Sequence, residues 1–126
     1  MIDRREFRRG DVVLASLPLP SDPSTAKIRP AVVVQNDVGN RFSANLIVAG
    51  ISSQLPRRPY PTNLIVPRSS PEGQGTGLDF DSVVQTEVIL TVAKGNVVRR
   101  LGRFPETAMR QIDECLGVSL GLSRRG

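Results

Sequence analysis

The chain has 126 residues and a formal net charge of +5, with 17 basic residues against 12 acidic ones. It contains one cysteine and no histidine or tryptophan, which excludes an internal disulfide, a zinc site built on histidine or paired cysteines, and any catalytic unit that needs histidine. The arginine-rich surplus suits an anionic partner such as nucleic acid, although it also follows from some genome compositions. Glycine-rich nucleotide motifs are missing as well, so we expect neither a metal nor a cofactor.

The ends and length of the chain suggest a simple organisation. The first residues are polar and charged, and no apolar stretch reaches the ~18 residues that cross a bilayer. We therefore expect a cytoplasmic protein that makes no contact with a membrane. The length predicts a single domain over residues 1–126, with residues 1–8 as a polar N-terminal arm.

Short apolar runs separated by glycine- and proline-rich segments fill most of the chain. They predict strands at residues 11–17, 30–35, 43–51, 62–66, 82–85, 87–92 and 97–104. Turns are expected at residues 36–41 and 94–96, and long loops at residues 18–28 and 67–78. Loops carry function in small barrels, so these two loops are the expected walls of a groove.

One helix is expected at the end of the chain. Residues 105–116 place apolar side chains at helical spacing. Pro105 fits the first helical turn, and Gly117 and Gly121 are expected to end the helix. Cys115 falls in the apolar stripe, which favours a core residue over a nucleophile. Several strands followed by one helix predict a mostly β fold, a small barrel with a C-terminal helix.

Polar side chains follow or precede two of the apolar strands. Arg29 stands directly before Pro30, which favours an extended backbone at Arg29. It is either a phosphate anchor at the mouth of the barrel or a solvated loop arginine. Ser52, Ser53 and Gln54 follow a long apolar run. Their hydroxyl and amide groups suit a phosphate or sugar oxygen, or they cap the end of the strand.

Carboxylate and aromatic side chains cluster in the predicted loops. Asp79 and Asp81 flank Phe80 and would share one face of an extended segment. They are candidates for a metal site or a general base, or they form a solvated turn. Phe80, like Phe42 and Tyr60, lies in or beside a loop. Such rings stack on the bases of single-stranded RNA or fill a core.

Several short motifs occur in a fixed order over residues 9–122. They are RGDVV at residues 9–13, RPAVVVQND at 29–37, GNRFS at 39–43, IVAGISSQ at 47–54, PTN at 61–63, DSVV at 81–84 and IDECLGVSLGL at 112–122. Each is weak alone, but their order and spacing together resemble the MazF/PemK (also called Kid) family of toxin ribonucleases. The resemblance implies an SH3-like barrel with a C-terminal helix, usually a homodimer.

The same resemblance implies an activity and a set of site residues. Members of that family are type II toxins that cut single-stranded RNA at selected sequences without a metal, leave a cyclic phosphate and a 5′-hydroxyl, and are neutralised by a small antitoxin. Arg29 matches the key arginine of the family, and Ser52 falls where most members have the catalytic threonine. The residues then expected to bind substrate are Ser53, Gln54, Asn40, Arg41 and Phe80.

One stretch departs from the family pattern. Where many members have a glutamine and an arginine lining the groove, this chain has Val88 and Leu90, which leaves base recognition open. Asp81 and Glu87 are both candidates for the general base. Two alternatives to the ribonuclease remain. One is a CcdB-like protein that poisons DNA gyrase, and the other is a member that binds antitoxin or RNA without cutting.

Overall fold

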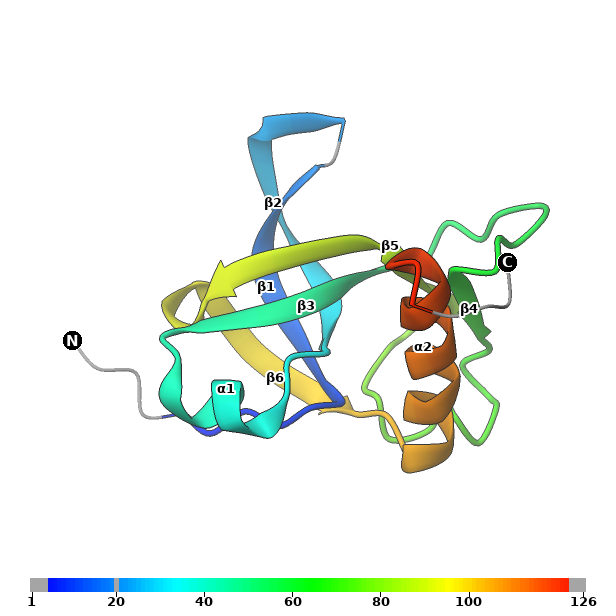
Figure 1. Cartoon of the computed structure of the whole chain (residues 1–126). Helices are drawn as coiled ribbons and strands as arrows, with labels where there is room; N and C mark the ends of the chain where they lie inside the picture. Colours follow the sequence, from blue (N-terminus) through cyan, green and yellow to red (C-terminus); the bar gives the residue numbers. More distant parts are fainter. Residues whose placement is uncertain (1–4, 20, 123–126) are drawn as a thin grey trace.

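Six strands and one long helix make up most of the chain. The computed structural model describes residues 5–19 and 21–122. The strands are β1 (Asp11–Leu19), β2 (Asp22–Val33), β3 (Asn45–Ser52), β4 (Asn63–Val66), β5 (Ser82–Ala93) and β6 (Val97–Arg103). The helical segments are α1 (Asp37–Phe42), the 3-10 turn η1 (Lys94–Asn96) and α2 (Glu106–Ser119). The strands form one curled antiparallel sheet in the order β4-β5-β3-β2-β1-β6, with α2 against β4 and β5 (Figure 1). The predicted mostly β fold with a C-terminal helix is confirmed.

The sheet carries an apolar layer on each face. Successive residues of a strand point to opposite faces, so Val12 and Val13 belong to different cores. The first core is enclosed by the curled sheet and includes Val13, Ala15, Ala31, Val33, Leu46, Val48 and Val92. The second core lies beneath α2, which contributes Ala108, Met109 and Ile112. Both layers draw on the alternating pattern of the same strands.

The first predicted loop is instead a β-hairpin. β1 and β2 stay paired as far as Leu19 opposite Asp22, so residues 18–28 project from the sheet as an arm (Figure 1). Pro18 does not interrupt the pairing, because this part of β1 has only β2 as a neighbour and a backbone N–H on its outer side would need no partner. Asp22 organises the tip by accepting hydrogen bonds from the hydroxyls of Ser24 and Thr25, at 2.6 and 2.7 Å.

A short helix, α1, replaces the turn predicted at residues 36–41. Asn36 caps this helix by accepting a hydrogen bond from the backbone N–H of Gly39, at 2.8 Å. Such a cap satisfies one of the N–H groups left free at the start of a helix. The residues that indicated a turn therefore begin a helix.

The N-terminal segment packs on the barrel where the structure describes it. Residues 1–4 of the predicted polar arm lie outside the described residues. Phe7 is buried in the first core. The guanidinium of Arg5 lies over the Phe7 ring and donates a hydrogen bond to the carbonyl of Val97, at 2.7 Å. Residues 5–8 are thus part of the folded body.

The C-terminal helix is longer than predicted. Of the two glycines expected to end it, Gly117 lies within the helix, and α2 continues to its C-cap at Leu120, directly before Gly121. Gly121 follows with a φ of 71°, a left-handed conformation that glycine adopts without strain. The backbone N–H groups of Gly121 and Leu122 bond to the carbonyls of Val118 and Gly117, which is a Schellman motif. None of the helices that the structure describes is long and apolar enough to span a membrane.

β5 is one irregular strand, and the predicted break at Thr86 is wrong. Its register with β3 shifts beside Gly50, which lies opposite Gln85. Residues 86–88 are consequently left without a partner on β3. Thr86 turns instead toward Thr62, whose carbonyl accepts hydrogen bonds from the Thr86 backbone N–H and hydroxyl, at 3.1 and 2.7 Å. This irregularity changes which side chains face the front of the sheet.

The loop between β4 and β5 closes the outer edge of β6. The backbone N–H of Arg103 donates to the carbonyl of Gly75, at 2.9 Å. A Cβ on Gly77 would lie 2.3 Å from the carbonyl oxygen of Leu101, and one on Gly102 would lie 2.2 Å from that of Gly75. Only glycine permits backbones to approach this closely. The loop is thereby fixed against the barrel.

Candidate active site

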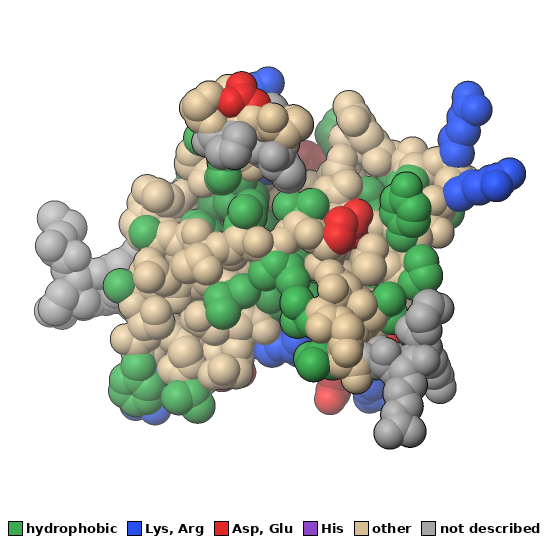
Figure 2. All heavy atoms as spheres, turned by 45° about the horizontal axis from the view of Figure 1, so that its top comes forward, with side chains coloured by type: hydrophobic (Ala, Val, Ile, Leu, Met, Phe, Trp, Pro, Cys, Tyr) green, Lys and Arg blue, Asp and Glu red, His purple; other side chains and the backbone are tan. Residues whose placement is uncertain are grey.

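A groove of about 840 Å³ opens where the inside of the curled sheet ends. One wall is the β1–β2 hairpin and the other is the segment at residues 77–80, while the floor comes from β3 and β5. Figure 2 shows hydrophobic side chains exposed on this side of the molecule, between the projecting hairpin and the right-hand part of the body. The prediction that the segments at residues 18–28 and 67–78 wall a groove is confirmed in part: the first contributes Pro18 and Lys27 and is a hairpin, and the second contributes Gly77 and Leu78.

Arg29 lies in the hairpin wall, on β2 opposite Ala15. Ala31 and Val33, two and four residues further along, are buried in the first core. Strand alternation therefore places Arg29 on the same inner face, where the apolar interior gives way to the groove. Arg29 is a half-buried strand residue and not a solvated loop residue. No other residue described in the structure forms a hydrogen bond or ion pair with its guanidinium, so its donors are available to an anion.

β3 ends in the groove at Ser52. Ile51 is buried beneath α2, so Ser52 faces the opposite way, toward the groove. The hydroxyl of Ser52 accepts a hydrogen bond from the backbone N–H of Gln54, at 3.0 Å. Ser53 and Gln54 are exposed, and both line the groove as well. Ser52 therefore caps its strand and still keeps a hydroxyl proton that can be donated to a ligand.

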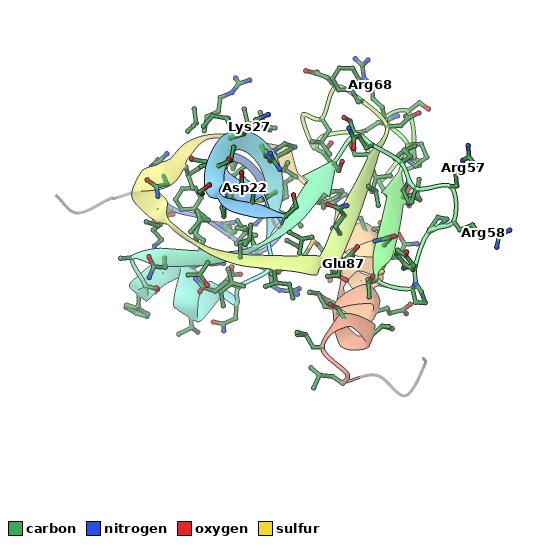
Figure 3. All side chains as sticks on the ribbon, turned by 90° about the horizontal axis from the view of Figure 1, so that it is seen from above. Asp22, Lys27, Arg57, Arg58, Arg68 and Glu87 are labelled. Carbon is green, nitrogen blue, oxygen red and sulfur yellow. The ribbon has the colours of Figure 1, made fainter. Side chains whose placement is uncertain are left out.

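The groove carries more positive than negative charge. Its basic lining residues are Lys27, Arg29 and Arg99, and its one acidic lining residue is Asp79. Lys27 lies on the hairpin, which Figure 3 shows from above. A concave surface with this charge balance favours phosphate groups.

Three polar lining residues did not stand out in the sequence. Lys27 fell within a predicted loop, and Gln85 sits in an apolar run. Arg99 is one of many arginines and reaches the groove through the pairing of β6 with β1, where it lies opposite Leu14. Only the pairing of distant strands brings these three residues together, so no local pattern indicated them.

Asn40 and Arg41, which were expected to bind substrate, lie on α1 and do not line the groove. Asn40 is buried, and its side chain exchanges hydrogen bonds with Gln35 at 2.9 and 3.0 Å. The carbonyl of Asn40 accepts a hydrogen bond from the buried ammonium of Lys94. The guanidinium of Arg41 lies over the ring of Phe42. The structure does not bring these two residues together with the other candidates.

The loop aromatics are exposed. Phe42, Tyr60 and Phe80 have 77%, 67% and 68% of their surface accessible, so the interpretation of these rings as core residues is wrong. Only Phe80 lines the groove. It is placed to stack on a base held there.

The acidic candidates are dispersed. Asp79 lines the groove, whereas Asp81 accepts a hydrogen bond from the backbone N–H of Arg68, at 2.7 Å. Glu87 lies outside the lining (labelled in Figure 3) and accepts a hydrogen bond from the hydroxyl of Thr62, at 3.1 Å. Within the part of the chain that the structure describes, no group of three or more histidine, cysteine, aspartate or glutamate residues could hold a metal ion.

Cys115 is half-buried on α2 and lies outside the groove. Burial raises the pKa of its thiol, and the negative charges of Glu114 and Glu87 raise it further. Since the thiolate is the nucleophilic form, a raised pKa disfavours a nucleophilic role. The prediction of a core residue is only partly met, because Cys115 is half-buried and belongs to neither core.

The sequence and the fold of the chain have known counterparts. Residues 8–120 match the model of a protein family described as PemK-like, MazF-like toxin of type II toxin-antitoxin system. The chain belongs to this family. A protein named endoribonuclease MazF from Staphylococcus saprophyticus is 35% identical over 116 residues, which cover 92% of each chain.

Solved structures with the PemK/MazF fold are also similar. An endoribonuclease from mycobacterial species, solved in complex with its cognate antitoxin, superimposes with a TM-score of 0.72 at 24% identity and covers 93% of this chain and 97% of its own. A MazE–MazF structure from Deinococcus radiodurans gives a TM-score of 0.71 at 17% identity, with 94% and 99% covered. At these identities the likeness concerns the fold, and it confirms the predicted small barrel with a C-terminal helix.

Proposed function

We propose that this chain is an endoribonuclease toxin of a type II toxin–antitoxin system, which cleaves single-stranded RNA in the cytoplasm at selected sequences. Membership of the PemK/MazF family supports this function, as does the 35% identity to a protein named endoribonuclease MazF. The observation that carries the proposal is that Arg29 and Ser52, from different strands, line one positively charged groove.

The proposed reaction uses a nucleophile that belongs to the RNA. The 2′-oxygen forms a bond to the neighbouring phosphorus, and the bond from phosphorus to the 5′-oxygen breaks. The 2′-hydroxyl loses its proton and the leaving 5′-oxygen gains one, so the products are a cyclic phosphate and a 5′-hydroxyl. Arg29 stabilises the negative charge that develops on the phosphate oxygens. Ser52 positions the phosphate by donating a hydrogen bond from its hydroxyl to one of these oxygens.

The rest of the groove would hold the RNA on either side of the reacting phosphate. Lys27 and Arg99 attract neighbouring phosphates, and the exposed ring of Phe80 stacks on a base. Ser53 and Gln54 supply further hydrogen bonds beside Ser52. None of these contacts requires a metal ion, so we propose cleavage without one.

A cleavage assay in EDTA tests the proposal. Purified protein is incubated with an RNA of mixed sequence, and the ends of the products are identified. We expect cleavage at preferred sequences, with a cyclic phosphate on one product and a 5′-hydroxyl on the other. RNA that stays intact would indicate a member that binds without cutting, and cleavage that stops in EDTA would contradict the metal-independent reaction.

We further propose two protein partners. The first is a cognate antitoxin, by analogy with the mycobacterial complex of the same fold. The second is another copy of this chain, because one small barrel offers a short groove for an RNA strand. Light scattering at micromolar concentration should give twice the chain mass of 13.7 kDa. A mass of one chain would contradict the dimer and leave the cleavage proposal standing.

A further inference from the structure

Gln85 carries an amide into the floor of the groove. It lies on β5 between Gly50 of β3 and Asn63 of β4, which pair with it on either side. Its neighbours in sequence, Val84 and Thr86, are fully buried. Because strand neighbours point to opposite faces, the Gln85 side chain faces the groove, where it is half-buried.

Gly50, opposite Gln85, lets two side chains of β5 lie close to the backbone of β3. A Cβ on Gly50 would lie 3.3 Å from Cγ1 of Val88, which is a tight contact, and 3.9 Å from Oε1 of Gln85, which is an ordinary van der Waals contact. The side chains of Gln85 and Val88 are therefore neighbours on the groove side of Gly50. The register shift of β5 at this point brings these two residues to the same side.

The Gln85 amide has no partner among the residues that the structure describes. In the part of the chain that the structure describes, no hydrogen bond involves its side chain, and the neighbouring Val88 offers only an apolar surface. Half-buried polar groups are ordinarily satisfied by hydrogen bonds. An amide held in a ligand-sized groove with both its donor and its acceptor unused is available to a ligand.

The position of the amide relative to Ser52 indicates which part of the RNA it would meet. Gly50 precedes Ser52 by two residues on the same face of β3, a rise of roughly 6.6 Å along the strand. The amide is thus displaced along the groove from the phosphate site formed by Arg29 and Ser52. A nucleotide adjoining that phosphate would present its base to Gln85.

We propose that Gln85 is a specificity-determining residue, whose amide binds the edge of the base next to the scissile phosphate; this inference rests on the proposed ribonuclease function. A glutamine amide places one donor beside one acceptor, which matches the N6 amino group and N7 of adenine; guanine presents two acceptors on that edge, and pyrimidines have no N7. Adenine is therefore the base expected at this position. Val88 contacts the same base through its apolar surface.

Cleavage-site mapping on a randomised RNA library tests the inference. The wild type is compared with Gln85→Leu, which removes the amide, and with Gln85→Glu, which replaces the amide with a carboxylate that only accepts hydrogen bonds. Gln111→Leu on the exposed face of α2 makes the same chemical change away from the groove and is the matched control. The readout is the relative rate for each base at each position beside the cut.

We expect Gln85→Leu to reduce the preference at one position by roughly 5- to 150-fold, the discrimination that one two-bond amide–base contact provides. The other positions should keep their preferences. Gln85→Glu should move the preference at that position toward cytosine, whose amino group is a donor. Gln111→Leu should match the wild type throughout.

Several outcomes would overturn the inference. An active Gln85→Leu variant with an unchanged preference would overturn it and leave the ribonuclease proposal intact. A preference for a base other than adenine at the position that Gln85 controls would overturn the assignment to adenine. If Gln85→Leu does not fold, Gln85→Glu decides, since an unchanged preference in that variant also contradicts the contact. A wild type that cuts no RNA would overturn the proposed function and this inference together.

Discussion

The hydroxyl oxygen of Ser52 accepts a hydrogen bond from the backbone N–H of Gln54, at 3.0 Å. This bond fixes the oxygen at the end of β3 and leaves the hydroxyl proton to be donated into the groove. Ser53, the next residue, lies beyond the end of β3, is exposed, and has no such contact in the described structure. The two adjacent serines therefore differ in role.

We predict that Ser52→Ala slows RNA cleavage more than Ser53→Ala does. Losing one donor aimed at the reacting phosphate typically costs roughly 10²–10³-fold in rate, whereas loss of a peripheral contact costs less. Single-turnover cleavage of a mapped RNA by both variants measures the difference. Equal losses, or a larger loss for Ser53→Ala, would show that the other serine faces the phosphate.

Arg29→Ala should remove most of the cleavage without unfolding the protein. Its guanidinium has no partner within the described chain, so little structure depends on it, and the expected loss in rate is roughly 10²–10³-fold. Arg29→Lys should restore only part of the rate, because an ammonium lacks the planar fork of the guanidinium. Thermal melts of both variants should lie near that of the wild type.

Arg110→Ala on the exposed face of α2 is the matched control for the loss of one positive charge. It should leave the cleavage rate unchanged. An Arg29→Ala variant that cuts within about threefold of the wild type, against the loss expected for a donor at the phosphate, would show that Arg29 is not the phosphate anchor.

Asn40→Ala should lower stability and leave the chemistry of the folded protein unchanged. Asn40 is buried, and its amide bonds to Gln35 and Asp37. Its removal leaves buried groups without partners, which costs about 2 kcal/mol of the free energy of unfolding. Arg41→Ala on the same helix should change that free energy by no more than about 0.5 kcal/mol. Urea unfolding measures both, and a stable but RNA-binding-deficient Asn40→Ala variant would contradict the structural role.

Asp37 should make the protein less stable in acid. Its carboxylate accepts a hydrogen bond from the backbone N–H of Arg9, at 2.8 Å, and another from the Asn40 amide, at 3.1 Å. These bonds hold the pKa of Asp37 below its ordinary value, with the bond from Arg9 the larger cause. A lowered pKa stabilises the fold above the unfolded pKa of about 3.9, and the stabilisation is lost as the pH falls through the folded pKa.

The corresponding measurement is the free energy of unfolding of Asp37→Asn between neutral pH and acid. This variant should lose stability at neutral pH and depend less on pH below about pH 5 than the wild type does. Glu72→Gln, which alters a loop carboxylate with no hydrogen bond or ion pair in the described structure, is the control. If the free energy of unfolding of Asp37→Asn depends on pH as that of the wild type does, the Asp37 carboxylate does not contribute to the loss of stability in acid.

The sequence predicted those elements of the fold that follow from the spacing of apolar residues along the chain. Alternating apolar residues such as Val12 and Val13 indicated strands with two buried faces, and the spacing around Ile112 indicated the helix. The hairpin arm was missed because its prolines, serines and Asp22 have the composition of a loop, and only pairing with β1 makes the segment a strand. Gly117 was mistaken for a helix end because packing of α2 on the sheet outweighs the modest cost of one glycine.

The site was predictable only where a motif marked it. Arg29 and Ser52 were identified from the family resemblance, and the structure places both in the groove. Asn40 was expected to bind substrate because it lies in the family-like motif GNRFS, yet Asn40 is buried and its side chain holds α1 in place. Gln85 and Arg99 carry no local signal, since a register shift in β5 and the pairing of β6 with β1 bring them to the groove.

The glycine-dependent contact between the β4–β5 loop and β6 also covers an edge of the sheet against strand pairing with other molecules. β6 is the last strand of the sheet, and an uncovered terminal strand recruits strands from other molecules into aggregates. The carbonyl of Gly75 accepts a hydrogen bond from the outward-facing backbone N–H of Arg103. Gly77 and Gly102 have no Cβ that would hold the loop away from β6. A larger residue at either position would push the loop away from β6, so these two glycines keep the edge of the sheet covered.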